Sequence, residues 1–164
     1  MRTTLASLLR QLEFSMDEIR RLDESVDQLG EQPHLKAIVE KLDAEKGVGR
    51  LTAVAYAVEV GDFSRFKRRQ QIGAYWGVTP GSQESGEVGD RKGHITRQGS
   101  PRMRRMLCQA AWSRVMHDEQ EREVYQRLVK RNPKRKKIAL VAAMRRLSIR
   151  LWHVGLKAQR GDAS

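Results

Sequence analysis

"HLKAIVEKLDAEKGVGRLTAVAYAVEV", residues His34 to Val60, contains two helix-forming runs separated by a short turn of glycine, valine and glycine. The first run, from about Leu35 to Ala44, repeats apolar residues at helical spacing. The second run is rich in small residues and ends at Gly61. The stretch therefore predicts a helical hairpin inside a mainly α-helical fold.

The turn of this hairpin has two interpretations. Gly47 and Gly49 would let the backbone approach a phosphate, and the free N–H groups of the next helix's first turn could bind that anion. Lys46 and Arg50 flank the turn with positive charge. The pattern resembles the helix-hairpin-helix DNA-binding motif, and a purely structural helical hairpin explains it equally well.

Upstream of the hairpin, residues 3–30 repeat apolar side chains in a heptad pattern that only Ser15 interrupts. Pro33 cannot continue a helix interior, so the helix is expected to end before it. We expect residues 1–32 to form a coiled-coil helical arm that joins copies of the chain into a homo-oligomer; a plain helix packed on its own domain is the alternative. The seam consists of Leu5, Leu8, Leu12, Ile19, Leu22, Val26 and Leu29.

Downstream of the hairpin, further helices complete a compact domain over residues 33–158, followed by a disordered tail over 159–164. Ser64 is a candidate N-cap of a short basic helix, and the Ser100-Pro101 pair is a typical start of the next one. Helices are expected over about 65–75, from 101 onward, over 118–130 and over 136–157, and the predicted core includes Phe63, Phe66, Ile72 and Trp76.

A glycine-rich stretch interrupts these helices. "TPGSQESGEVGDRKGHITRQGSPRMRRM", Thr79 to Met106, holds five glycines, two prolines, three serines and several arginines. We expect a loop here, with a short hairpin at 86–95. Its Ser85-Gly86 step is followed closely by the start of a basic helix.

The net charge of +12 is unevenly distributed. Residues 1–45 hold six Lys/Arg and ten Asp/Glu, a net −4, whereas residues 46–164 hold 26 and ten, a net +16. A strongly basic globular region is typical of nucleic-acid binding, because phosphates release counterions when it binds. A membrane surface is a weaker alternative, since aromatic residues make up only 5%. No apolar run has transmembrane length and no signal-peptide pattern is present, so we expect a cytoplasmic protein.

The sequence does not support an internal disulfide, a nucleotide-binding motif or a metal site. The single Cys108 cannot form an internal disulfide, and it lies in an apolar helical stretch typical of a small buried side chain. No phosphate-binding loop, dinucleotide fingerprint or organised acidic triad is present. The four histidines have no ligand spacing, so no metal site is expected; they are His34, His94, His117 and His153.

Ser85 is the candidate nucleophile. A serine hydroxyl needs a base or strong electrostatic help, and phosphoryl transfer also needs cations to meet the charge that grows on the phosphate oxygens. An ordinary turn is the alternative for this Ser-Gly step. The cations that surround Ser85 in the sequence are Arg91, Lys92, Arg97, Arg102 and Arg104.

Four blocks in a fixed order resemble the C-terminal domain of the IS-one-ten family of insertion-sequence transposases. They are "EKGVGRLTAVAYAVEVGDFSRF", "QIGAYWGVTPGSQESG", "HITRQGSPRMRRMLCQAAW" and "KKIALVAAMRRLSIRLW". The resemblance covers about residues 42–155, and the heptad helix is similar to the coiled-coil segment of these enzymes.

The resemblance implies a recombinase that moves a DNA element. Its serine attacks a DNA phosphodiester, as in serine recombinases, and the family nucleophile maps onto Ser85. The basic residue of the Ile-x-basic-x-Gly block maps onto Arg97, and the arginine of the following helix onto Arg104. Family members use a structured guide RNA that pairs with target and donor DNA. Charge and resemblance together assign DNA binding to Lys46, Gly47, Gly49, Arg50, Arg91, Lys92, Arg97, Arg102, Arg104 and Arg105.

Departures from the family pattern limit these expectations. The N-terminal nuclease-like domain with acidic metal ligands has no counterpart here, so Mg²⁺ is expected only with that domain, and the chain is expected to be inactive alone. Ser100 stands where the family has asparagine, and Glu45-Lys46 replaces Pro-Gly before the hairpin turn. Whether Ser82 or Ser100 could act as the nucleophile in place of Ser85 stays open. Two other functions also stay open: a non-catalytic helix-hairpin-helix nucleic-acid-binding protein and a coiled-coil oligomerisation adaptor.

Overall fold

The computed structural model describes residues 2–81, 94–131 and 133–161. Within these ranges it contains seven α-helices, two 3-10 turns and one isolated antiparallel bridge, between Pro80 and Ile95. The prediction of a mainly α-helical fold is confirmed.

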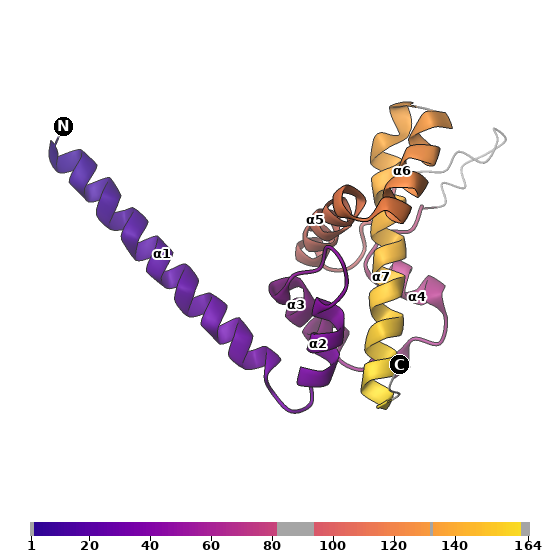
Figure 1. The fold of residues 1–164 in the computed structure, drawn as a ribbon, viewed down its shortest axis with the longest axis horizontal. Coiled ribbons are helices and arrows are strands. Elements are labelled where there is room, and N and C mark those ends of the chain that lie inside the picture. Colours follow the sequence, from indigo (N-terminus) through magenta and orange to yellow (C-terminus); the bar gives the residue numbers. More distant parts are fainter. Residues whose placement is uncertain (1, 82–93, 132, 162–164) are drawn as a thin grey trace.

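The helices follow one another as Figure 1 labels them. They are α1 (Arg2–Gly30), α2 (Lys36–Asp43), α3 (Arg50–Val60), α4 (Arg69–Tyr75), α5 (Pro101–His117), α6 (Glu119–Arg131) and α7 (Lys136–Arg160), with the 3-10 turns η1 (Phe63–Arg65) and η2 (Pro133–Arg135). Most ends lie within three residues of those predicted. The last helix continues three residues beyond its predicted end.

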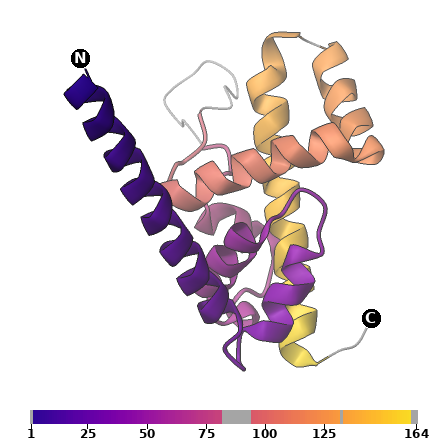
Figure 2. The same cartoon turned by 60° about the vertical axis from the view of Figure 1, so that its left-hand side comes forward.

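Helix α7 is the central element of the body. Its 25 residues run the length of the domain, and α2, α4, α5 and α6 all pack against it. Figure 2 shows α5 crossing α7. The face of α7 that meets these neighbours is apolar and buried, with Ala143, Leu147 and Leu151 among its residues. A single apolar core therefore forms around one long helix.

Large aromatic side chains fill that core. Trp76, Tyr56 and Phe63 are fully buried, and Nε1 of Trp76 donates to the Tyr56 hydroxyl at 3.4 Å. The Tyr56 hydroxyl donates to the backbone oxygen of Ser148 at 2.6 Å, and burial raises the pKa of this phenol. Among the predicted core residues, Phe63, Ile72 and Trp76 are confirmed as buried, while Phe66 is half-buried.

The prediction of a helix over 65–75 capped by Ser64 was wrong at its start. The N–H and hydroxyl of Ser64 both bond to the Asp62 carboxylate, at 2.8 and 2.7 Å, which closes the 3-10 turn η1 instead. The backbone then becomes extended, and α4 begins only at Arg69. There the side chain of Gln71 accepts hydrogen bonds from two preceding backbone N–H groups. Side-chain bonds to the backbone thus moved the helix start by four residues.

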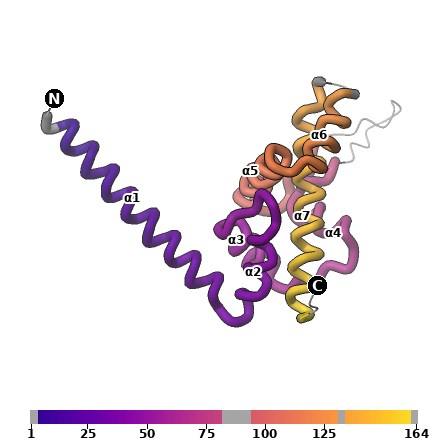
Figure 3. The backbone as a smooth tube through the Cα atoms, in the orientation of Figure 1, coloured from indigo at the N-terminus to yellow at the C-terminus, as the bar shows by residue number. Residues whose placement is uncertain are grey.

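Helix α1 extends away from the body, and only its C-terminal end meets α3 (Figures 1 and 3). Val26 and Leu29, at the end of the heptad seam, pack against the core. Arg50 at the start of α3 fixes this end through Asp27 at 3.4 Å and Glu31 at 2.6 Å. Hydrogen bonds from Lys36 and then Arg50 hold the pKa of Glu31 below its ordinary value.

The rest of the heptad seam lies open. Five seam side chains are between 55% and 60% exposed: Leu5, Leu8, Leu12, Ile19 and Leu22. The last turn of the helix therefore packs on its own domain, as the alternative interpretation expected. The remaining seam has no cover among the described residues, and the coiled-coil arm stays a prediction.

Candidate nucleic-acid interface

The glycine-rich stretch leaves and rejoins the body at one place. The backbone N–H of Gly81 donates to the oxygen of His94 at 2.9 Å, and that of Thr96 donates to Thr79 at 3.0 Å. Gly81 and His94, which flank segment 82–93, therefore lie side by side in a short antiparallel pair. The segment itself, with the predicted hairpin at 86–95 for the most part, lies outside the described residues.

Residues 77–81 and 94–99 form the base of the glycine-rich stretch, here called the loop base, and two glycines allow the chain to close it. Gly77 has φ +66° and Gly99 has φ +88°. A Cβ on Gly77 would lie 1.9 Å from the backbone oxygen of Gln98, and one on Gly99 would lie 2.0 Å from that of Tyr75. Only glycine fits such a conformation and such an approach, so both positions are fixed by the loop base.

Arg104 holds the base from α5. Its Nη1 donates to the backbone oxygens of Gly99 at 3.0 Å, Gln98 at 3.2 Å and Trp76 at 3.5 Å. The half-buried guanidinium thus bonds the two sides of the loop base together. Its predicted contact with DNA stays a prediction.

Glu59 of α3 anchors the start of α5. Its carboxylate accepts from Arg102 at 2.8 Å and from the Ser100 hydroxyl at 3.2 Å, and its backbone oxygen accepts from the Tyr75 hydroxyl at 2.8 Å. Ser100 also accepts from the backbone N–H of Met103 at 3.2 Å, which confirms the predicted N-cap. The loop base is therefore tied to three elements of the body.

Arg97 and Arg105 are two further described cations that were predicted to bind DNA. Both are exposed, and their side chains have no hydrogen-bond or ion-pair partner among the described residues. Arg97 has a positive φ of 54°, uncommon for a residue with a side chain, and lies in the loop base. The structure brings Arg97, Arg102 and Arg104 to this base; Ser85, Arg91 and Lys92 lie outside the described residues.

The hairpin turn before α3 faces the protein's own body. Gly47, with φ +82°, packs so closely on α5 that a Cβ would lie 2.7 Å from the oxygen of Ala110. Lys46 pairs with Asp118 at 3.6 Å, and Arg50 pairs with the acids of α1 described above. Gly49 is exposed. These contacts favour the structural interpretation of the hairpin, and its role in DNA binding stays a prediction.

The two predicted groups of basic residues are far apart. Arg102 and Asp118, the partner of Lys46, lie sixteen positions apart at opposite ends of α5, which corresponds to about 24 Å. The hairpin turn and the loop base therefore do not form one compact site.

A buried ion cluster connects the turn to α5, α6 and α7. Only one of its pairs, Arg114 and Asp118 at helical spacing, was recognisable in the sequence. Arg114, only 7% exposed, lies 3.2 Å from Glu45, 3.6 Å from Glu121 and 3.9 Å from Asp118. Arg150 contacts Glu45 from α7 at 2.5 Å. A hydrogen bond from the backbone N–H of Glu121 lowers the pKa of Asp118.

The described residues contain no group of three His, Cys, Asp or Glu side chains placed to hold a metal ion. No described helix combines the length and apolar character that crossing a bilayer requires. Cys108 is half-buried against the core.

A basic helical domain whose glycine-rich stretch leaves and rejoins the body beside several arginines is typical of proteins that bind nucleic acid. The sequence profile described as "Transposase IS116/IS110/IS902 family" matches residues 39–126, more than half of the chain. The chain therefore belongs to this transposase family, the family that the four sequence blocks resemble.

Curated relatives agree with this assignment. The chain is 42% identical over 83 residues to a putative transposase, y4qE, of Sinorhizobium fredii, covering 49% of the chain and 21% of the relative. It is 30% identical over 111 residues to a probable family 20 transposase of Pseudomonas aeruginosa, covering 65% and 32%. It is 29% identical over 114 residues to the transposase for insertion sequence element IS1111A of Coxiella burnetii, covering 66% and 30%. The chain thus spans about a third or less of the length of these relatives.

Proposed function

We propose that this chain is the DNA-binding and strand-exchange part of a transposase, with Ser85 as its nucleophile. The observation that carries the proposal is the loop base, which holds both ends of the Ser85 segment together next to Arg97, Arg102 and Arg104. Because the chain belongs to a transposase family, we propose DNA as its substrate. A guide RNA and a magnesium-binding nuclease-like domain, as in the family that the blocks resemble, would complete the enzyme.

The proposed step is a transesterification. The Ser85 oxygen attacks a DNA phosphorus, a serine–phosphate bond forms, and the bond from phosphorus to one deoxyribose oxygen breaks. The serine proton passes to a nearby base or water, and the released deoxyribose oxygen takes up a proton. Nearby guanidinium groups would stabilise the charge that develops on the phosphate oxygens. Reversal of the step by another strand's hydroxyl rejoins DNA without ATP.

The proposal predicts a covalent protein–DNA adduct that depends on Ser85. The chain is combined with end-labelled DNA, a guide RNA and the nuclease-like domain of a longer family member, and the products are separated under denaturing conditions. We expect an adduct with the unchanged chain and none with Ser85→Ala, because the attacking oxygen is gone.

Ser82→Ala is the matched control, since it removes a hydroxyl from the same segment. It should leave the adduct in place. An adduct that persists in Ser85→Ala would contradict the assignment of the nucleophile, and its loss in Ser82→Ala would point to Ser82 instead.

We also propose that the open seam of α1 joins two or more copies of the chain. Five apolar side chains in heptad register, each more than half exposed, are the pattern with which helices form coiled coils. A second copy offers the same seam, so the two stripes could cover each other by symmetry.

The oligomer can be tested with Leu12→Glu combined with Ile19→Glu. Both side chains are exposed in the single chain, so the fold should survive while two buried charges disrupt the seam. Sedimentation is expected to show a mass near one chain. Ser7→Glu with Phe14→Glu, which places the same charges beside the seam, should keep the assembled mass; equal masses for the two variants would contradict the proposal.

A further inference from the structure

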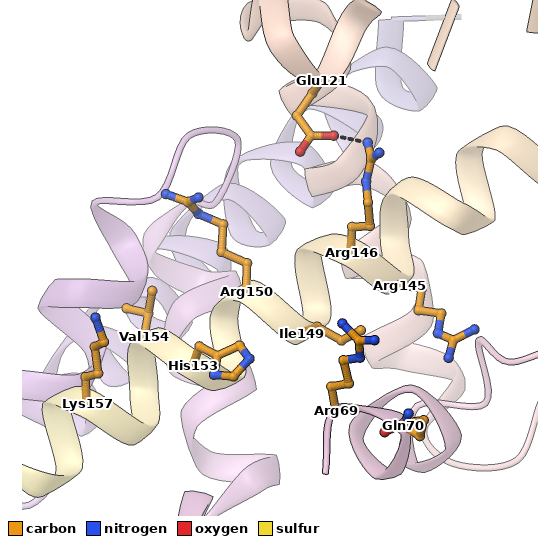
Figure 4. A pocket seen from close by; sticks show the side chains of 10 residues that line it. All are labelled: Arg69, Gln70, Glu121, Arg145, Arg146, Ile149, Arg150, His153, Val154 and Lys157. Carbon is orange, nitrogen blue, oxygen red and sulfur yellow. Dashed lines mark hydrogen bonds and ion pairs between the residues drawn. The ribbon is translucent and has the colours of Figure 1, made fainter. Parts of the chain in front are cut away.

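We propose that the cleft between α4 and α7 binds the sugar–phosphate backbone of duplex DNA and leads it to the loop base. This inference builds on the proposed function, because it supplies a path to the Ser85 segment. The cleft encloses about 740 Å³. Figure 4 shows Arg69 and Gln70 of α4 on one side and a row of side chains from α7 on the other.

The lining of this cleft is strongly basic. Its charged side chains are five cations and one acid, a net charge of +4 with His153 neutral. The acid, Glu121, is already engaged by Arg146 and by the buried Arg114. The five cations are Arg69, Arg145, Arg146, Arg150 and Lys157.

Three of these cations are available to a ligand. The side chains of Arg69, Arg145 and Lys157 have no hydrogen-bond or ion-pair partner among the described residues, and Arg69 and Lys157 are exposed. Cations gathered along a hollow without acids to neutralise them attract a polyanion, because binding releases the counterions of its phosphates.

The cations along α7 span a length comparable to several successive phosphates of one DNA strand. Arg145 and Lys157 are twelve positions apart on this helix, which corresponds to about 18 Å. Successive phosphates of one DNA strand advance by about 3.4 Å along the duplex axis, so the row covers about five phosphate steps. Arg69 adds a cation from the opposite wall.

One end of the cleft opens at the loop base. A Cβ placed on Gly73 of α4 would lie 3.3 Å from Nε of Arg145 and 3.2 Å from the side chain of Thr79. Arg145 therefore lies next to Thr79, two residues before Gly81, where the described part of the glycine-rich stretch ends. A backbone bound along α7 would run toward Gly81, after which the segment that carries Ser85 begins in the sequence.

The character of the lining favours a duplex over an unpaired strand. Proteins that hold single strands add aromatic rings on which the bases stack. No Phe, Tyr or Trp lines this cleft in the described part of the chain. The family acts on DNA, so a DNA duplex is the occupant to which the proposal commits.

The test compares two charge-matched triple variants of the full chain. The cleft variant is Arg69→Gln, Arg145→Gln and Lys157→Gln; the control is Arg10→Gln, Lys41→Gln and Arg127→Gln, exposed cations elsewhere that also lack partners among the described residues. Circular dichroism checks that both fold. Binding to a fluorescent DNA duplex is followed by anisotropy over a range of salt concentrations.

We expect the cleft variant to bind DNA roughly tenfold more weakly or worse, and its plot of log affinity against log salt to be shallower by about 2–3. The control should change the slope by less than about one. Equal losses in both variants would overturn the inference. So would a cleft variant that loses affinity for an RNA duplex and keeps its affinity for DNA.

Because the measurement is binding and not cleavage, it separates this inference from the proposed nucleophile. If the cleft variant loses DNA but Ser85→Ala still forms the adduct, the cleft is supported and Ser85 is wrong. If the adduct depends on Ser85 but the two triple variants bind alike, the nucleophile is supported and the cleft is wrong.

Discussion

Arg114→Met is expected to lower the free energy of unfolding by about 3 kcal/mol. Arg114 is buried and lies within 3.9 Å of three carboxylates, those of Glu45, Asp118 and Glu121. Methionine fills a similar volume but leaves these acids without their central cation. Removal of one partner from a buried ion pair is costly, because the remaining charge has lost its hydration without compensation.

The loss stays moderate because each acid keeps an outer partner. Glu45 retains Arg150, Glu121 retains Arg146 and Asp118 retains the exposed Lys46. Urea denaturation measures the change. Arg105→Met is the matched control, since Arg105 is an exposed residue of the same helix without a partner among the described residues, and it should change stability by less than about 0.5 kcal/mol.

A loss below about 1 kcal/mol in Arg114→Met would show that the cluster is solvated in solution, in which case the ion pairs contribute as little as surface pairs do. The result matters for function as well. The same cluster positions α6 and α7, which supply Glu121, Arg146 and Arg150 to the basic cleft.

Gly77→Ala is expected to destabilise the fold and to disrupt the loop base. Gly77 has a positive φ, and backbone strain of this kind costs about 1–3 kcal/mol for a residue with a side chain. The new methyl group would also lie 1.9 Å from the backbone oxygen of Gln98, which cannot move without breaking the bonds that Arg104 makes there. We expect a total loss of about 3 kcal/mol or more.

Gly161→Ala is the control that separates backbone strain from steric overlap of the added methyl group. Gly161 has a similar φ of +70° at the end of α7, but a Cβ there meets nothing within 4 Å. Its loss should be only about 1–2 kcal/mol, the cost of the left-handed conformation alone. Equal losses at the two positions would mean that the loop base is free to rearrange around the added methyl group.

The disruption should also abolish the proposed chemistry. The segment that carries Ser85 follows Gly81, four residues after Gly77, so a displaced base is expected to displace the proposed nucleophile. A chain with Gly77→Ala that remains folded at low temperature is therefore expected to bind DNA through its basic surface but to form no adduct.

The sequence predicted well those structural features that depend only on residues close together in the chain. Heptad spacing gave the long α1, and the Ser100-Pro101 pair gave the start of α5, because helix periodicity and N-caps depend on residues within one or two turns. The start of α4 was predicted wrongly because a competing local hydrogen bond was overlooked. The Asp62 carboxylate accepts from Ser64 and holds it in a 3-10 turn. The family blocks were likewise visible as contiguous sequence.

Only the tertiary structure decided which charges are engaged and which are available. Lys46, Arg50 and Arg104 looked like free cations in the sequence, yet each bonds to groups of its own chain. Arg69 and Arg145, at the start of α4 and within α7 with the whole of α5 and α6 between them, line one cleft that no local pattern indicates. An ion pair such as Glu45–Arg150 joins residues 105 positions apart, and such pairs form only once the packing of the apolar core has brought the helices together.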